Sequence, residues 1–314
     1  MSEEIVDIEI NPNKRSWREL WQIPTLGVAA LLLLTGLIGV ILTRPEPDID
    51  GMIKAAEARI TKAEHAEALE ILNGKIRQHV DAPFITEDQL QSFHLLRARA
   101  VGKGQRELGI NDQSNHESVL NEYEAAEQAG AELTIDDHVL RLESILELGQ
   151  FDEAVTKLAE IGDEHSAERI RIRKEIIERA LGDRIPRNEL AEAQLLELTQ
   201  DTMLGVDDRC WAAARRAQMQ LNQGFIDEAI TGILREMPRV ASAQPHARGE
   251  LFTLLGRGYM EIGAVSEARK QLERATELIE SDDDLFAETL LQLGMSLEQT
   301  GEMELALDQF DVIT

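Results

Sequence analysis

Four stretches of the chain repeat one spacing of glycine, alanine and bulky apolar residues, which restricts the chain to folds built from similar helical units. In each stretch a glycine is followed five residues later by alanine, and four residues after that by a bulky apolar residue. Residues four apart lie on the same face of an α-helix. The four sets are Gly149, Ala154 and Leu158; Gly224, Ala229 and Ile233; Gly263, Ala268 and Leu272; and Gly301, Ala306 and Phe310.

This spacing predicts pairs of packed antiparallel helices. The glycine ends the first helix of a pair, where a positive φ is often required. The alanine lies where the two helix backbones approach closely, so a larger side chain does not fit. Gly256 and Gly294 are small residues of the preceding helices that admit the partner helix. From Gly51 onward the apolar residues recur every three or four residues, without the alternation of apolar and polar residues that is typical of β-strands.

The last two units resemble the tetratricopeptide repeat family, whose unit of about 34 residues carries a W-x₂-L-G-x₂-Y, Gly, A-x₃-F pattern. FTLLGRGYMEIGAVSEARKQLERA (252–275) matches nearly every position, and LLQLGMSLEQTGEMELALDQFDVI (290–313) matches well. The resemblance implies an all-α fold, in which residues 51–314 form a tetratricopeptide-like α-solenoid. We expect about seven helix pairs in this region, with the clearest pattern over residues 250–314.

Three further units are predicted from looser matches. Residues 56–76 keep Ala68 and Leu72 but carry Ala63 where the glycine is expected. Residues 92–130 are interpreted as a unit with a stretched turn, and residues 167–198 as a degenerate helix pair.

The N-terminal part contains an uncharged apolar run, PTLGVAALLLLTGLIGVILT, at residues 24–43. Twenty helical residues span about 30 Å, the thickness of the hydrocarbon core of a bilayer. We predict an N-terminal transmembrane helix at 24–43 that acts as an uncleaved signal anchor, since no small-x-small cleavage site follows. A core helix is the weaker interpretation, because the run has no polar face.

Flanking charges set the predicted orientation. Lys14, Arg15 and Arg18 precede the span, whereas Arg44 and Lys54 follow it, and a Lys/Arg excess favours the cytoplasmic side. We therefore expect a cytoplasmic segment at 1–23, a linker at 44–50 and the solenoid outside the cytoplasm. Bacterial envelope proteins with this layout are similar, which implies a single-pass protein of the bacterial inner membrane.

Composition excludes some classes of partner. The chain has 32 Lys and Arg against 59 Asp and Glu, a formal charge of −27. A surface this acidic repels phosphates, so no nucleic-acid partner is expected. A basic run holds Arg169, Arg171, Arg173 and Lys174, for which pairing with neighbouring acidic residues is favoured over docking of an acidic partner.

The sequence offers no pattern typical of an enzyme or of a metal or cofactor site. The seven histidines are scattered without helical ligand spacing, and no Walker loop or G-x-S-x-G is present. Cys210 is the single cysteine, which excludes an intrachain disulfide. We therefore expect a protein that is not an enzyme and that takes no cofactor and no metal.

In the tetratricopeptide family the first helices line a concave surface that binds peptides or partner proteins, and the resemblance implies the same surface here. One subtype of the family has a clamp of Lys, Asn and Arg residues that binds the C-terminal carboxylate of a partner. The matching positions here include Val139, Glu143, Ala214 and Gln218, so this clamp is not expected. The predicted groove residues are Glu143, Glu147, Gln218, Arg257, Met260, Glu261, Met295 and Glu298, with Val139, Leu146, Ala214, Leu221, Thr253, Leu291 and Gln299 beside them.

These features predict a membrane-anchored protein–protein interaction scaffold that binds partner proteins or peptides in envelope complex assembly, secretion or quality control. The alternative is that the chain is the N-terminal part of a longer protein, with an enzymatic or signalling module beyond Thr314. Its motivation is that residues 303–314 still carry an apolar repeat face, whereas terminal repeats usually have a polar cap. A third hypothesis uses this face for homo-oligomers.

Overall fold

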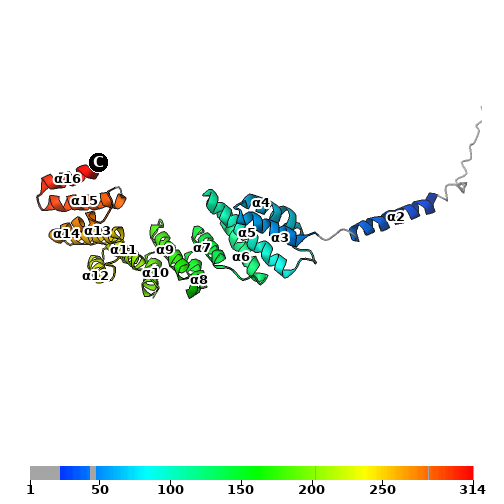
Figure 1. Ribbon diagram of the computed structural model, residues 1–314, viewed down its shortest axis with the longest axis horizontal. Helices are drawn as coiled ribbons and strands as arrows, with labels where there is room; N and C mark the ends of the chain where they lie inside the picture. Colours follow the sequence, from blue (N-terminus) through cyan, green and yellow to red (C-terminus); the bar gives the residue numbers. More distant parts are fainter. Residues whose placement is uncertain (1–21, 43–46, 202, 282, 314) are drawn as a thin grey trace, which may run out of the picture. The chain divides into compact units, whose positions relative to one another are not determined.

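The computed structural model describes residues 22–42, 47–201, 203–281 and 283–313, and in these ranges the chain is helical without strands (Figure 1). The chain divides into two compact units, Met1–Gly51 and Met52–Thr314. The predicted all-α fold is confirmed. The predicted cytoplasmic segment at 1–23 and the basic residues before the apolar run fall almost entirely outside the described residues.

The first unit contains α2, Gln22–Leu42, which has no charged residue. Among the side chains that are described, Leu26, Leu31 and Leu33 are exposed. In the described part of the chain, no helix has the length and apolarity needed to cross a membrane. The predicted span at 24–43 is therefore not confirmed and stays a prediction.

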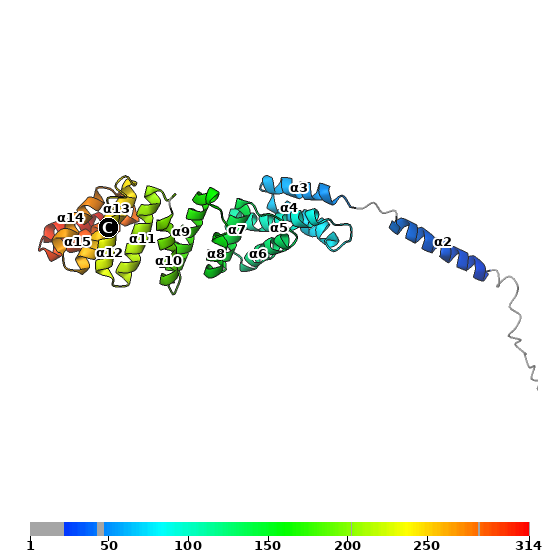
Figure 2. The same cartoon turned by 90° about the horizontal axis from the view of Figure 1, so that it is seen from below.

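The second unit is a series of helix pairs that follow one another in chain order (Figures 1 and 2). Figure 1 shows α8, α10 and α12 along one side of the row, with α7, α9 and α11 on the other. From α5 onward the two helices of each pair pack against each other, and each pair also contacts the pair before it. The pairs are α3 (Ile49–Thr61) with α4 (His65–Glu70) and the π-helix η1 (Ile71–Ile76); α5 (Glu87–Leu108) with α6 (Gln113–Gln128); α7 (Ile135–Glu147) with α8 (Phe151–Leu158); α9 (Ser166–Gly182) with α10 (Asn188–Gln200); α11 (Val206–Asn222) with α12 (Ile226–Glu236); α13 (Pro245–Glu261) with α14 (Val265–Thr276); and α15 (Asp284–Gln299) with α16 (Met303–Ile313).

The turns inside the four pairs with the clearest pattern have the backbone conformation that the sequence predicts. Gly149, Gly224, Gly263 and Gly301 all have positive φ, between 70° and 83°. Ala63 occupies the same position in the first pair and has φ 61°, a left-handed conformation that costs an alanine more than a glycine. The first pair therefore has the same kind of turn with alanine in place of glycine.

The small residues inside the pairs lie where the helices approach most closely. Ala154, Ala229, Ala268 and Ala306 are at most 1% exposed. A Cβ added at Gly256 would lie 2.6 Å from Cγ of Leu272, which leaves no room for a side chain. The prediction that these positions admit the partner helix is confirmed.

The apolar core of the second unit is divided among neighbouring pairs. One cluster joins α7 and α8 with α9 and α10, a second joins α9 and α10 with α11, and a third joins α11, α12 and α13. Such a solenoid is stabilised by contacts within each repeat and between adjacent repeats. On α16, the side chains of Met303, Leu307 and Val312 are each more than half exposed, in agreement with the apolar face expected there.

Candidate functional site

Polar side chains connect the first helices of successive pairs in two groups, one around Glu143 and Glu147 and one around Arg215, which we together call the network. The connected residues are separated in sequence by about one repeat: Arg106 with Glu143, Glu178 with Arg215, and Arg215 with Glu250. Because each repeat places its first helix beside the previous one, residues one repeat apart face each other. The network therefore marks the row of first helices from α5 to α13.

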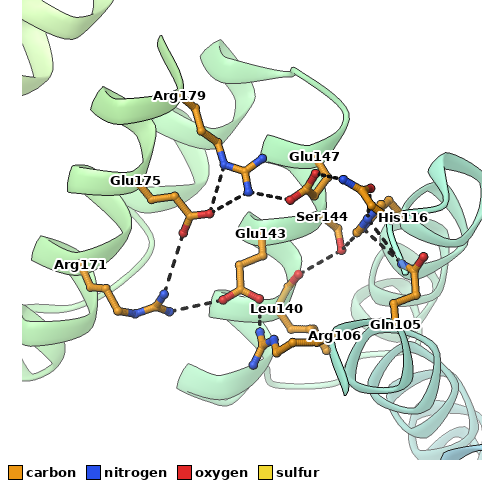
Figure 3. A network of polar contacts seen from close by, with 11 residues as sticks. Gln105, Arg106, His116, Leu140, Glu143, Ser144, Glu147, Arg171, Glu175 and Arg179 are labelled. Carbon is orange, nitrogen blue, oxygen red and sulfur yellow. Dashed lines mark hydrogen bonds and ion pairs between the residues drawn. The ribbon is translucent and has the colours of Figure 1, made fainter. Parts of the chain in front are cut away.

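Glu143 on α7 lies at the centre of the network shown in Figure 3. Its carboxylate accepts hydrogen bonds from Arg106 on α5 and from Arg171 on α9, the latter at 3.5 Å. Arg171 also forms an ion pair with Glu175 one turn further along α9, at 3.9 Å. One half-buried carboxylate thus holds the guanidinium groups of two neighbouring repeats.

Glu147 lies one turn after Glu143 and is held in a similar way (Figure 3). Arg179 of α9 donates a hydrogen bond of 2.6 Å to Glu147, and Asn111 donates another from the turn after α5. The hydrogen bond from Arg179 is the main reason why the pKa of Glu147 lies below its ordinary value. Glu147 is therefore a carboxylate at neutral pH.

His116 of α6 borders this network. Its ring lies 3.0 Å from Oδ1 of Asn111 and 3.3 Å from Oγ of Ser144. Partial burial disfavours the charged ring and lowers the pKa of His116, although the carboxylate of Glu147 opposes this effect. The ring is consequently neutral at pH 7 and serves as a hydrogen-bonding group.

The second group of contacts joins α9 with α11 around the ring of Trp211. Lys174 of α9 forms an ion pair with Asp208 at 2.8 Å, and its Nζ lies 4.8 Å from the ring centre of Trp211. The guanidinium of Arg215 lies 5.7 Å from the same ring. Contacts of this kind stabilise a cation by about 0.5–1 kcal/mol at exposed sites. Trp211 therefore fixes two cations at the junction of α9 and α11.

Three cavities open beside these first helices, and we call them the first-helix cavities. One of about 370 Å³ lies where α7 and α8 meet α9 and is lined by Glu147, Phe151 and Arg187. A second, of about 400 Å³, lies between the C-terminal halves of α9 and α11. A third, of about 520 Å³, lies where α9 and α11 begin and is lined by Lys174 and Met203.

The structure places the predicted groove residues in two groups. Glu143, Glu147 and Gln218 belong to the network or line the cavities, whereas the others lie on the C-terminal parts of α13 and α15. Arg257 donates a hydrogen bond of 3.0 Å to Asn222. Met260 is half-buried, and the exposed members of this group are Glu261, Met295 and Glu298, with Leu291 and Gln299 beside them.

Four neighbouring positions that were also predicted to line the groove do not do so, whereas a fifth, Leu146, lines the cavity beside Glu147. The side chains concerned are at most 9% exposed, so they are not available to a partner. Thr253, for example, donates or accepts a hydrogen bond of 2.8 Å with Thr289 of the next first helix. These positions face the adjacent repeat, and the prediction was wrong for Val139, Ala214, Leu221 and Thr253.

The basic run is paired internally, which confirms the favoured interpretation. Arg169 contacts Asp163 and Asp201, and Lys174 contacts Asp208. Arg171 and Arg173 likewise pair with glutamates of neighbouring helices. The sequence analysis missed Arg179, Arg215 and Trp211. The separation by about one repeat of Arg179 from Glu147, and of Arg215 from Glu250, was a signal that could have found the two arginines. Within the described residues, no group of three His, Cys, Asp or Glu is arranged to hold a metal ion.

Comparison with known proteins gives similarity in structure only. No family model matches the chain, and no curated protein matches it significantly. The apo form of RapI is 15% identical over 84% of this chain and 75% of its own, with a TM-score of 0.52. A Rap protein complexed with competence and sporulation factor is 16% identical over 86% of this chain and 76% of its own, with a TM-score of 0.45. A tetratricopeptide repeat protein from Parabacteroides merdae is 15% identical over 84% and 98%, with a TM-score of 0.41. The likeness to RapI concerns the fold.

Proposed function

We propose that this chain, whose fold is that of a tetratricopeptide-like solenoid, is a scaffold that binds a peptide segment of a partner protein along the first-helix cavities. The observation that carries the proposal is the cavity of about 400 Å³ between α9 and α11. It is bordered by the ion pairs of Arg215 with Glu178 and Glu250, at 2.7 and 2.6 Å.

The lining of this cavity suits the backbone of an extended peptide. Four amide side chains, Asn188, Gln218, Asn222 and Gln223, line it together with Leu181 and Met219. Each amide offers both a donor and an acceptor of hydrogen bonds, as does each peptide unit of an extended chain. The two charged residues that line the cavity, Glu178 and Arg215, balance each other. Backbone contacts rather than net charge therefore attract the segment, and the apolar residues receive its side chains.

Site-specific photocrosslinking of the full-length chain in native membranes tests the proposal. A benzophenone amino acid placed at Gln218 of α11 should capture a defined partner, whereas the same group at the exposed Thr231 of α12 should not. The captured segment is then made as a peptide. Its affinity should fall at least about tenfold in a Gln218→Ala, Asn222→Ala variant, because two hydrogen bonds are lost. Equal capture at both positions would contradict the proposed surface.

The proposal extends to the location of the scaffold at a membrane. Its support is the uncharged sequence of α2 and the exposure of Leu26, Leu31 and Leu33, which are side chains that lipid would cover. In this arrangement residues 24–43 anchor the chain, and the solenoid recruits partner proteins for assembly at the membrane surface without acting on them chemically.

Flotation with phosphatidylcholine vesicles tests the anchor. The full-length chain should float with the vesicles and resist extraction at high pH, whereas a variant without residues 1–45 should stay in the dense fraction. Flotation of both chains, or of neither, would refute the anchor and leave the proposal on the peptide surface untouched, because that surface belongs to the second unit.

A further inference from the structure

A cavity on the side of α11 away from Gln218 has a lining unlike that of the first-helix cavities. It has a volume of about 350 Å³ and lies among α10, α11 and α12. Four arginines line it against one carboxylate, that of Glu236. This concentration of cations occurs in a chain with a net charge of −27. The four are Arg209, Arg216, Arg235 and Arg239.

Two of these arginines lack a close counter-ion. Arg209 and Arg216 lie seven residues apart and so share one face of α11. Among the residues that the structure describes, Arg209 has no ion pair, and the nearest carboxylate to Arg216 is that of Glu192 at 3.9 Å. Nε of Arg216 is buried without a hydrogen-bond partner. The guanidinium of Arg216 thus lines the cavity with only a distant carboxylate beside it, and an anion in the cavity would supply the closer counter-ion.

The other two arginines contact Glu236. Arg239 is 3.0 Å and Arg235 is 3.4 Å from Oε1 of this residue. One carboxylate thus faces two exposed guanidinium groups, so the cavity keeps an excess of positive charge. An adjoining cavity of about 380 Å³ shares Arg216 and Arg235 and adds the carboxylates of Asp227 and Glu228. Those acids lie in the first turn of α12, whereas Arg209 lies in the first turn of α11, and their negative charge disfavours an anion in the adjoining cavity.

Gly232 keeps the cavity open. Glycine inside a helix costs about 1 kcal/mol relative to alanine, and at Gly256 close packing explains that cost. At Gly232 the nearest atom to an added Cβ is 3.9 Å away, so packing does not require glycine. The equivalent residues of other repeats, one before the bulky apolar position, are Lys157, Gln271 and Gln309. Gln271 is buried, whereas glycine leaves this space empty.

The floor of the cavity is apolar and made of small side chains. Ala212, Ala217, Ala229 and Ile233 line it and are at most 2% exposed. The volume lies in the range of small-molecule sites, about 300–1,000 Å³. Guanidinium groups above an apolar floor suit a ligand with an anionic head and a compact apolar body.

We propose that the cavity among α10, α11 and α12 binds a small organic anion, with a phosphate or carboxylate group held by Arg209 and Arg216 and an apolar body on the alanine floor beside Gly232. The same helix, α11, presents Gln218 on its other side. Occupation of the cavity therefore acts on the helix that borders the proposed peptide surface.

Calorimetric titration of the full-length chain in a neutral detergent tests this inference with three probes. Phenyl phosphate and phthalate separate a phosphate from a carboxylate head, and benzyl alcohol is the uncharged control. We expect one or both anions to bind and benzyl alcohol not to bind. An Arg209→Gln, Arg216→Gln variant should lower the affinity at least about tenfold, since charge-assisted hydrogen bonds are lost.

Two further variants separate a built site from general attraction to cations. Gly232→Leu fills the cavity without removing a charge and should also lower the affinity at least about tenfold, while the helix gains propensity. Arg184→Gln removes an exposed arginine outside the cavity and should bind the probes as the natural chain does. No binding of either anion, or equal binding by the natural chain, Gly232→Leu and the double variant, would overturn the proposal.

Discussion

Removing the charge of Asp137 should destabilise the junction between the second and third helix pairs more than any surface substitution. Asp137 of α7 is 1% exposed. Arg99 of α5 donates two hydrogen bonds to it, at 2.7 and 2.6 Å, and Tyr123 of α6 donates one at 3.1 Å. The backbone N–H and the hydroxyl of Thr134 donate two more, at 3.0 and 2.6 Å. The carboxylate thus joins three helices and caps one of them.

The magnitude follows from the burial of the pair. Breaking a buried ion pair by removing one partner costs about 3–5 kcal/mol. The side chain of Arg99 is 24% exposed, so water can partly solvate it after the substitution. We therefore expect Asp137→Asn to lower the free energy of unfolding by about 2–3 kcal/mol at pH 7, below the range for a fully buried pair.

The effect should depend on pH in a defined direction. Burial alone would raise the pKa of Asp137, but the hydrogen bonds from Arg99 and Thr134 outweigh it and hold the pKa below its ordinary value. As the pH falls, the unfolded chain therefore binds the proton first, near pH 4. The stabilisation is complete above about pH 5 and is lost as the pH falls through the lower pKa of the folded state.

Urea denaturation followed by far-UV circular dichroism measures this prediction, with the natural chain and Asp137→Asn compared at pH 7 and pH 3. An Arg99→Gln, Asp137→Asn variant completes a double-mutant cycle and should lose less than the sum of the single losses. The reasoning is refuted if Asp137→Asn changes the free energy of unfolding by less than about 0.5 kcal/mol at pH 7, or if the difference is the same at both pH values.

Two further substitutions and one labelling reaction test the packing of the repeats. Ala268→Leu should cost about 1–3 kcal/mol by overpacking, whereas Ser266→Leu on the exposed face of α14 should not; equal stabilities in thermal unfolding would count against the packing described for Gly256. Ala63→Gly should raise the free energy of unfolding by about 0.5–1 kcal/mol in urea denaturation, because φ 61° is unfavourable for alanine; a loss would contradict this. Burial raises the pKa of the Cys210 thiol to about 11, so a maleimide should label the chain only after denaturation, and rapid labelling of the native chain would be inconsistent with its burial.

The sequence predicted the helix pairs because their contacts are local and repeat. Gly263 and Ala268 belong to one hairpin, and a turn with positive φ and a close approach of two backbones each require a particular kind of residue. The same reasoning extended to Ala63, because the bulky and small residues around it kept their order. A fixed spacing is thus sufficient to recognise a repeat even where the turn residue differs.

The candidate site was harder to predict because its contacts lie between repeats. Val139 and Thr253 are on first helices, as expected for groove residues, but they face the next repeat and are buried. Which side of a first helix faces the neighbouring pair depends on the rotation from one pair to the next, and the pattern of small residues inside a pair does not specify it. Ion pairs such as Arg215 with Glu250 depend on this rotation, but they can be identified only when the positions of the neighbouring helices are known.

The distribution of charge connects the stability of the solenoid with its two proposed surfaces. Acidic residues outnumber basic residues by 59 to 32, so most arginines can find a carboxylate, and Arg171, Arg179 and Arg215 do so across the first helices. Such pairs align neighbouring repeats, and their mutual neutralisation leaves the first-helix cavities without a strong field. Arg209 and Arg216 lie on the opposite side of the same helix without a close carboxylate, although acids are abundant. Cations without a close carboxylate in a cavity can still gain electrostatic stabilisation when an anion binds. This contrast between the two faces of α11 is the reason why we propose a different ligand for each.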